Sequence, residues 1–170
     1  MLDRHLFIIG MPGSGKSSLG KRVAGQLRIP YVDMDQRISA LVGCTIPELF
    51  ERYGEEAFRH AETNTLVQLT YEQPSLISTG GGTVMREENR AIMRNFGAII
   101  LIDRPLEDIM SDIKLDRRPL LAQKGLSEVE RLYHERIDTY RAAADIVMDN
   151  SQGYHAGVYN LDRIVRSFCV

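Results

Sequence analysis

Residues 10–17 read Gly-Met-Pro-Gly-Ser-Gly-Lys-Ser, which is a complete G-x-x-x-x-G-K-[ST] phosphate-binding loop. The loop follows an apolar run at residues 5–9 and precedes a helical pattern that places Leu19, Val23 and Leu27 on one face. A strand, this loop and a helix, in that order, form the context in which the motif binds phosphate. The stretch therefore predicts a nucleoside triphosphate site at the start of an α/β fold.

The residue types within the loop match the chemistry of phosphate binding. Glycines let the backbone bend and bring its N–H groups against phosphate oxygens, and the following helix adds its positive N-terminal end. Lys16 can reach the β- and γ-phosphates, and the Ser17 hydroxyl can ligate Mg²⁺. We expect nucleotide contacts from one continuous run, namely Gly13, Ser14, Gly15, Lys16, Ser17 and Ser18.

The bulk composition is that of an ordinary soluble globular protein, with 44% hydrophobic and 26% charged residues. A length of 170 residues suits one domain with a substantial core, and no linker or repeat divides residues 1–170. The formal net charge of −2 argues against nonspecific nucleic-acid binding, which needs a basic surface. We therefore expect no nucleic-acid partner, and we expect a monomer.

Targeting and redox features are also absent from the sequence. No apolar run approaches the roughly 18–20 residues that a membrane span requires, so we expect no membrane partner. The first apolar stretch is short and runs directly into the glycine loop, unlike a signal peptide. Cys44 and Cys169 are too few for a disulfide framework or a metal cluster. A cytoplasmic location is the expected one.

Apolar runs alternate with helical patterns along the chain, which predicts a three-layer α/β sandwich around a parallel sheet. The strands expected from these runs are Leu6–Gly10, Tyr31–Asp33, Leu76–Thr79, Ile99–Asp103 and Ile146–Asp149. Capping boxes predict helix starts at residues 45–48 and 127–130. Pro105 is suited to opening the helix after the fourth strand, and Gly97 to ending the helix before it.

A basic segment of weak periodicity occupies residues 112–125, between two predicted helices. Its four basic residues are Lys114, Arg117, Arg118 and Lys124. Such a segment suits a lid that covers phosphates, because lids are drawn from poorly anchored stretches. A plain solvated loop is the alternative interpretation.

Three consecutive glycines, Gly80, Gly81 and Gly82, follow the third predicted strand. Glycines at the carboxyl end of a parallel strand let a ligand lie close against the backbone. This end is also where open α/β sheets bind ligands. We favour a floor for the substrate over a flexible connection.

Two aspartates lie just beyond the second predicted strand. One carboxylate of the pair Asp33 and Asp35 can hold Mg²⁺ directly or through water, because Mg²⁺ prefers oxygen ligands. Another can accept a proton from an attacking hydroxyl or simply orient it. The alternative is that Asp35 only caps the helix that follows.

Two arginines are candidates for holding an anionic substrate. Arg59 shares a helix face with Glu62, which can fix its guanidinium. Arg136 sits close to the apolar stripe of its helix, where a charged side chain usually has a partner. Two guanidiniums converging in a cleft would suit a carboxylate. Taken singly, each arginine fits a local ion pair better.

Together these residues resemble a shikimate kinase over nearly the whole chain. The matching elements, in order, are the loop at 10–17, Asp33-Met34-Asp35, Phe58-Arg59 with Glu62, Ser78-Thr79-Gly80-Gly81-Gly82, Arg118-Pro119-Leu120-Leu121, and Glu135-Arg136 followed by Tyr140. The phosphate loop is common to a vast superfamily, whereas its combination with the other elements is far more specific.

The resemblance implies a five-stranded parallel sheet of order 2-3-1-4-5, related to nucleoside monophosphate kinases. It implies transfer of the ATP γ-phosphate to the 3-hydroxyl of shikimate, with Mg²⁺, within aromatic amino-acid biosynthesis. The implied shikimate contacts are Asp35, Arg59, Arg136 and Gly80–Gly82. The implied catalytic residues are Lys16, Asp35 and Arg118, of which Arg118 also meets the nucleotide phosphates. The implied metal ligands are Ser17 and Asp33.

The sequence departs from the family pattern in three regions. Arg136 is followed by Ile137-Asp138-Thr139-Tyr140, where the family often shows Pro-Leu-Tyr. The sequence has no obvious counterpart of the arginine that the family often places under adenine early in the lid, for which Lys114 or Arg117 can substitute. The adenine-side segment at residues 150–154 is also unlike the commoner versions. These departures concern contacts to the nucleotide base rather than the reaction.

Two other functions stay open at this point. One is a small-molecule kinase for another acceptor, such as a gluconate-like polyol acid or a nucleoside monophosphate. The other is a nucleotide-sensing module without catalysis, against which stand the intact lysine, serine, aspartates and lid arginine.

Overall fold

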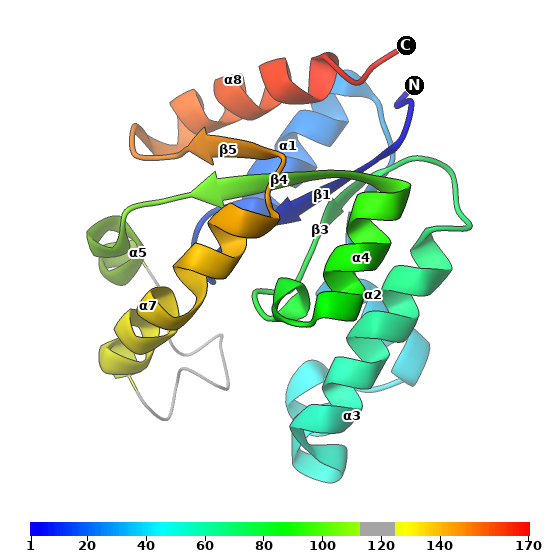
Figure 1. Ribbon diagram of the computed structural model, residues 1–170, viewed down its shortest axis with the longest axis vertical. Helices are drawn as coiled ribbons and strands as arrows, with labels where there is room; N and C mark the ends of the chain where they lie inside the picture. The colour runs from blue at the N-terminus through cyan, green and yellow to red at the C-terminus, as the bar shows by residue number, and fades with distance from the viewer. Residues whose placement is uncertain (113–124) are drawn as a thin grey trace.

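A five-stranded parallel sheet forms the centre of the computed structural model, which describes residues 1–112 and 125–170 (Figure 1). The strands are β1 (His5–Ile9), β2 (Tyr31–Asp33), β3 (Leu76–Ser78), β4 (Gly97–Asp103) and β5 (Ile146–Asp149). Their order is β2-β3-β1-β4-β5, which confirms the expected topology. The runs of apolar residues also placed every one of these strands correctly, with small shifts at the ends.

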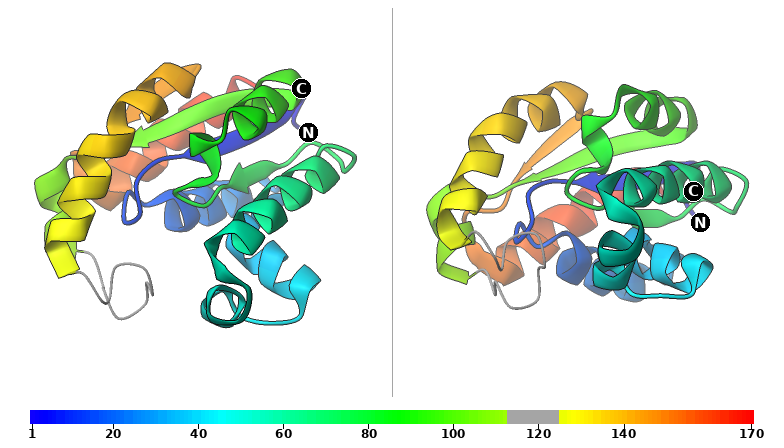
Figure 2. Two further views of the ribbon diagram at one scale, coloured as in Figure 1. Left: turned by 60° about the horizontal axis from the view of Figure 1, so that its bottom comes forward. Right: turned by 90° about the horizontal axis from the view of Figure 1, so that it is seen from below.

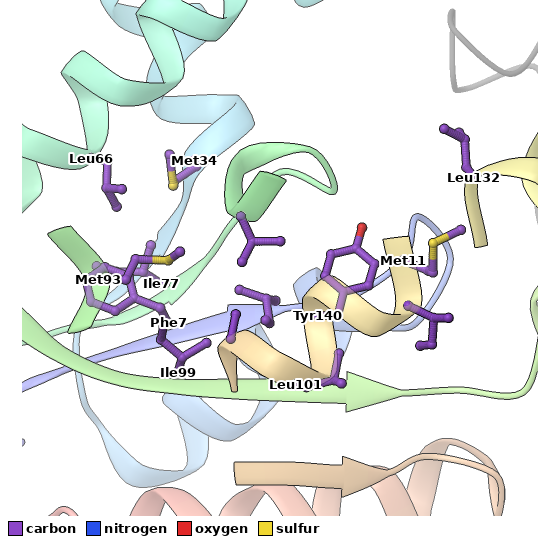
Figure 3. Close-up of a cluster of buried hydrophobic side chains, with 14 of the residues drawn as sticks. Phe7, Met11, Met34, Leu66, Ile77, Met93, Ile99, Leu101, Leu132 and Tyr140 are labelled. Atoms are coloured by element: carbon purple, nitrogen blue, oxygen red, sulfur yellow. The ribbon is translucent and has the colours of Figure 1, made fainter. Parts of the chain in front are cut away.

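The central strands are apolar on both faces because helices cover both faces of the sheet. Along β1, Leu6 and Ile8 point into one core cluster, whereas Phe7 and Ile9 point into another. Successive side chains of a strand face opposite sides, so one short apolar run supplies two cores. Figure 3 shows the second of these clusters, in which Tyr140 lies among aliphatic side chains.

The helices form the two outer layers. One face carries α1 (Lys16–Leu27) and α8 (Gly153–Arg166), which pack against each other. The opposite face carries α4 (Glu87–Phe96) and α7 (Gly125–Ala143), both of which contact β4. The predicted three-layer sandwich is therefore confirmed.

A separate helix pair projects beyond the sheet, on the side away from α7 (Figure 2). It consists of α2 (Met34–Val42) and α3 (Ile46–Leu69), and the latter changes direction at Gly54, where φ is 80°. A small apolar cluster of Ile38, Leu49 and Phe58 joins the two helices. The remaining helical segments are the 3₁₀ turn η1 (Thr83–Met85) and α5 (Leu106–Asp112).

The predicted helix boundaries have mixed outcomes. The capping box at Thr45 is present, with both of its reciprocal hydrogen bonds to Glu48. The capping box predicted at Ser127 is wrong, because α7 begins at Gly125 and already includes Ser127. An N-cap needs non-helical backbone, so Ser127 does not occupy the N-cap position of α7. Gly97 ends α4 as expected, and Pro105 stands immediately before α5.

None of the helices in the described part of the chain is both long and apolar enough to cross a membrane.

Candidate active site

The carboxyl ends of the parallel strands lie along one edge of the sheet, and the predicted site residues follow these ends. The phosphate loop follows β1, Asp35 follows β2 and the triple glycine follows β3. Open α/β sheets bind their ligands at this edge. The fold therefore gathers at one place segments that are far apart in the sequence.

The phosphate loop has the backbone that its glycines predict. Gly13 and Gly15 adopt φ values of 87° and 99°, which residues with a β-carbon rarely adopt. Gly10 lies so close to β4 that a β-carbon there would be 2.7 Å from the Ile102 carbonyl oxygen. The loop then enters α1, whose first N–H groups have no acceptor within the helix, an arrangement that binds anions.

Lys16 is held inside this loop. Its side chain is buried, and the ammonium group donates 2.9 Å hydrogen bonds to the carbonyl oxygens of Gly10 and Met11. A lysine ammonium is a compact charge on a flexible stem, so a small rotation can carry it from these carbonyls to a phosphate oxygen. The structure thus places the positive charge of Lys16 beside the backbone N–H groups of the phosphate loop.

Three oxygen-bearing side chains meet beside the loop. The Ser17 hydroxyl lies 3.2 Å from the Ser78 hydroxyl, and Asp33 is directly opposite Ser78 in the pairing of β2 with β3. One carboxylate oxygen of Asp33 accepts hydrogen bonds from the backbone N–H groups of Asp35 and Gln36, at 3.1 and 3.3 Å. The residue that caps α2 is therefore Asp33, and the capping role considered for Asp35 is wrong.

These oxygens fit a magnesium ion better than a transition metal. The described residues contain no group of three His, Cys, Asp or Glu side chains that could hold a metal ion. Mg²⁺ needs no such group, because it binds through one or two carboxylates, waters and substrate phosphates. Suitable oxygen ligands for Mg²⁺ here are the hydroxyls of Ser17 and Ser78 and the second carboxylate oxygen of Asp33.

Tyr31 closes the same corner of the site. Its hydroxyl donates to the Ser17 carbonyl at 3.3 Å, and its ring packs against Gly20, where a β-carbon would be 2.9 Å away. Burial, and then the charge of Asp33, raises the pKa of Tyr31 to about 12. The phenol is consequently a neutral donor at physiological pH.

The triple glycine leaves room for charged side chains. A β-carbon on Gly82 would collide with the Arg59 guanidinium, and one on Gly80 would lie 2.6 Å from a Glu62 carboxylate oxygen and 3.3 Å from Asp35 Oδ1. A β-carbon on Gly81 would press on the ring of Pro12, 3.1 Å away. None of the three glycines has a positive φ. Close approach, rather than backbone conformation, explains why glycine stands here.

Glu62 fixes the guanidinium of Arg59. The carboxylate is 1% exposed, and it accepts 2.6 Å hydrogen bonds from Arg59 Nη1 and from the Thr83 hydroxyl. Arg59 also pairs with Glu55 at 3.0 Å. Burial alone would lower the pKa of Arg59, but the two glutamates outweigh burial and raise it. The predicted pairing with Glu62 is confirmed, and it holds the guanidinium against Gly82.

Arg136 is connected to the triple glycine through Tyr140, which lies one turn further along α7. The Tyr140 hydroxyl donates a 2.5 Å hydrogen bond to the Gly81 carbonyl. Burial raises the pKa of Tyr140, and the positive charges of Arg136 and Arg59 oppose that rise. Arg136 Nε is buried and has no hydrogen-bond partner among residues 1–112 and 125–170. This donor is suited to an anionic ligand.

The structure thus brings most of the predicted site residues together. The loop, Asp33, Asp35, Arg59, the triple glycine and Arg136 surround one region at the edge of the sheet. Arg118 and its basic neighbours Lys114, Arg117 and Lys124 lie outside the described residues. The predicted lid at 112–125 falls almost wholly in that part of the chain.

Several residues of the site could not be singled out from the sequence. Thr83 and Tyr31 support Glu62 and Ser17, and neither belongs to a recognisable motif. Arg104 Nη1 donates to the Gly13 carbonyl at 3.0 Å, and Asn150 Nδ2 donates to the Ser14 carbonyl at 2.9 Å. The sequence held one signal for Arg104 and Asn150, since each of them directly follows a predicted strand.

A groove of about 450 Å³ opens along α1 and beside the first turn of α8. Its lining residues are Ser18, Lys21, Arg22, Gly25, Gln26 and Tyr154. Ser18 is one of the predicted nucleotide contacts, and Tyr154 belongs to the segment expected on the adenine side. The groove therefore continues from the phosphate loop toward the N-terminus of α8.

Comparison with known proteins agrees with this geometry. The family model described as shikimate kinase matches residues 12–165. A shikimate kinase of Clostridium beijerinckii is 44% identical over 151 residues, which cover 89% of this chain and 88% of the relative. One of Clostridium botulinum is 39% identical over 164 residues, which cover 96% and 98% of the two chains.

Solved structures show the same likeness. The shikimate kinase of Acinetobacter baumannii in complex with shikimate has a TM-score of 0.88 at 29% identity, and the match covers 96% of this chain and 92% of that one. The enzyme of Aquifex aeolicus has a TM-score of 0.81 at 33% identity, with coverage of 96% and 95%. By its sequence over residues 12–165 and by its fold, this chain belongs to the shikimate kinase family.

Proposed function

We propose that this chain transfers the γ-phosphoryl group of ATP to the 3-hydroxyl of shikimate, giving shikimate 3-phosphate and ADP. The observation that supports this most directly is the pair of guanidiniums at the triple glycine: Arg59 lies against Gly82, and Arg136, with a buried Nε that has no partner among the described residues, is on the helix whose Tyr140 bonds Gly81. A cyclic alcohol with a carboxylate suits this pair, because charge-assisted bonds from two arginines can fix the carboxylate. The phosphate loop lies next to it, where Gly81 meets Pro12.

In the proposed reaction the protein acts chiefly by positioning and by neutralising charge. Asp35 lies beside Gly80 and would orient the attacking hydroxyl or accept its proton. Lys16 would turn from the loop carbonyls to the transferring phosphate. Arg118, which lies outside the described residues, keeps the phosphate-binding role that the sequence resemblance implies.

Mg²⁺, held by Ser17 and Asp33 together with phosphate oxygens, would supply further neutralisation of the phosphate charge. Ser78 would support Ser17 through the contact between their hydroxyls. The neutral Tyr31 phenol would hold the backbone of Ser17 in place. In this proposal the side-chain oxygens of Ser17 and Asp33 bind the ion. The hydroxyls of Ser78 and Tyr31 hold Ser17 in position.

The proposal extends to partners and location. Shikimate and ATP are the expected small-molecule partners, and neither nucleic acid nor a membrane is needed. We propose that the enzyme works as a monomer in the cytoplasm.

The test is an acceptor panel in an assay of ADP release. Shikimate, its methyl ester, gluconate and nucleoside monophosphates are each offered at equal concentration with ATP and Mg²⁺. We expect release with shikimate and a large loss with the ester, which cannot pair with two guanidiniums. Faster turnover of gluconate or of a nucleoside monophosphate would replace the proposed acceptor. Tight ATP binding without release in any sample would instead indicate a nucleotide-sensing module.

A further inference from the structure

The carbonyl groups of the phosphate loop are held by side chains. Lys16 bonds the carbonyls of Gly10 and Met11 from within the loop. The carbonyls of Gly13 and Ser14 are bonded from outside it, by Arg104 at 3.0 Å and by Asn150 at 2.9 Å. The two outside donors lie 91 and 136 residues along the chain from their acceptors. Tertiary structure, and not local sequence, therefore fixes this side of the loop.

The sheet places the two outside donors next to each other. Asp103 of β4 pairs with Asp149 of β5, and Arg104 and Asn150 are the residues that follow them. The Asn150 backbone N–H donates to the Asp103 carbonyl at 2.8 Å, which extends the pairing by one step. Both side chains are consequently anchored at the carboxyl edge of the sheet, on rigid backbone.

The surroundings of Asn150 are shaped for its amide. The residue is buried, and Gly157 of α8 leaves the space that the amide oxygen fills, since a β-carbon at Gly157 would collide with Asn150 Oδ1. A β-carbon at Gly15, on the opposite side, would be 3.4 Å from Asn150 Nδ2. The amide is thus clamped between the phosphate loop and α8.

The bond to Ser14 sets the direction of a phosphate-binding group. The described peptide bonds are all trans, so the C=O and N–H of one peptide unit point in opposite directions. When the Ser14 carbonyl points outward to Asn150, the N–H of Gly15 in the same unit points into the loop. The N–H of Ser14, by contrast, is already used in a 3.1 Å turn with the Met11 carbonyl.

We propose that Asn150 is a positioning residue of the nucleotide site, which orients the Ser14–Gly15 peptide so that the Gly15 N–H faces a nucleotide phosphate. This inference rests on the proposed nucleotide site but not on the identity of the acceptor. Arg104 holds the preceding peptide in the same way. Preorganised N–H groups bind phosphate without a cost of reorientation on binding.

The first experiment compares purified full-length variants for binding of ADP by calorimetry. Asn150→Ala removes the donor, and Asn150→Leu keeps a similar shape without charge but cannot donate. We expect both to weaken ADP binding by about five- to tenfold, the effect of one lost hydrogen bond. The matched control is Asn95→Ala, which removes an exposed asparagine of α4 and should leave ADP binding unchanged.

Steady-state kinetics separate positioning from general damage. We expect KM for ATP to rise with the ADP dissociation constant, while KM for shikimate stays within about twofold. Equal rises in both KM values would overturn the proposal, as would ADP binding within about twofold of wild type in either folded variant. Suppose that shikimate causes no ADP release while the Asn150 variants still bind ADP more weakly than the control does. In that case the proposed function fails and this inference stands.

Gly157→Ala perturbs the amide from its far side while Asn150 is still present. The added methyl group must displace the amide oxygen, so we expect weaker ADP binding, similar to that of Asn150→Ala. When Gly157→Ala is combined with Asn150→Ala, the added methyl group has no amide to displace. We therefore expect this double variant to bind ADP no more weakly than Asn150→Ala alone. Additive losses would contradict the proposal.

Discussion

The hydroxyl of Tyr140 donates a 2.5 Å hydrogen bond to the carbonyl of Gly81, and this bond ties α7 to the turn after β3. The Tyr140 ring is fully buried in the core between the sheet and that helix (Figure 3). The same helix carries Arg136, so the position of one candidate substrate ligand depends on this anchor. Core packing and site geometry are therefore linked through a single side chain.

We predict that Tyr140→Phe destabilises the protein by about 1–2 kcal/mol, because the Gly81 carbonyl loses a buried donor. KM for shikimate should rise more than KM for ATP, since the bond lies on the acceptor side. Urea unfolding and steady-state kinetics measure the two effects. Tyr71→Phe is the control, because Tyr71 is 86% exposed and should show neither effect. Equal changes in the two KM values would contradict this prediction.

Gly82→Ala tests the space that the triple glycine provides. The added methyl group would collide with the Arg59 guanidinium, so we expect KM for shikimate to rise by about tenfold with the fold intact. Gly25→Ala is the matched control. Nothing lies within 4 Å of a β-carbon there, and alanine in a helix should add about 0.5–1 kcal/mol of stability without changing KM. An unchanged KM for shikimate in Gly82→Ala would show that Arg59 does not help to bind the acceptor.

Arg136→Ala should weaken capture of shikimate by about 1.5–3 kcal/mol, the usual worth of a charged hydrogen bond. Arg136→Lys should recover part of this loss, because it keeps the charge but not the planar fork. Arg131→Ala on the same helix is the control, since its pairs with Glu128 and Glu135 are at the surface. A KM for shikimate that is unchanged in Arg136→Ala would remove Arg136 from the site.

Lys16→Met should lower kcat by about a hundredfold or more, in line with removal of a charge that stabilises the transition state. The methionine keeps most of the apolar stem, so circular dichroism and the unfolding midpoint should change little. Arg166→Met at the C-terminal end of α8 serves as the control and should keep full activity, because this exposed side chain pairs only locally with Asp162. Retention of kcat by Lys16→Met would show that the loop lysine has no part in the transfer.

The sequence predicted the fold well because strong local signals carry it. Buried parallel strands are short apolar runs, and the glycines of the phosphate loop follow from its positive φ angles. The helix start predicted at Ser127 was wrong because capping depends on backbone conformation, which the residue types of the pattern do not reveal. Local patterns thus locate elements more reliably than they locate the ends of helices.

The site was harder to predict where function depends on distant contacts. Gly80 and Gly82 were expected to let a ligand approach the backbone, and the structure adds that a β-carbon on either would also meet Glu62 or Arg59, which lie about 20 residues earlier in the chain. Asn150 and Arg104 act on the loop through single hydrogen bonds that no spacing encodes. Such residues become visible only when the sheet brings its strand ends together.

His5 makes stability depend on pH in a defined window. Its Nδ1 accepts the Ser75 backbone N–H at 3.2 Å, which requires an unprotonated nitrogen, and burial lowers its pKa below the ordinary 6.5 despite the nearby charge of Glu72. Below about pH 6.5 the unfolded chain therefore binds this proton more readily than the folded chain. The free energy of unfolding should fall as pH decreases from 7 toward 5.

The variant His5→Asn isolates this contribution. Its amide oxygen can still accept the Ser75 N–H, but it does not titrate, so the decline between pH 7 and 5 should become shallower. Urea unfolding at several pH values measures the slopes. The ion pair of Glu72 with Arg37 lowers the pKa of that carboxyl, and its own loss of stability comes only at lower pH. Identical slopes for wild type and His5→Asn would show that another group is responsible.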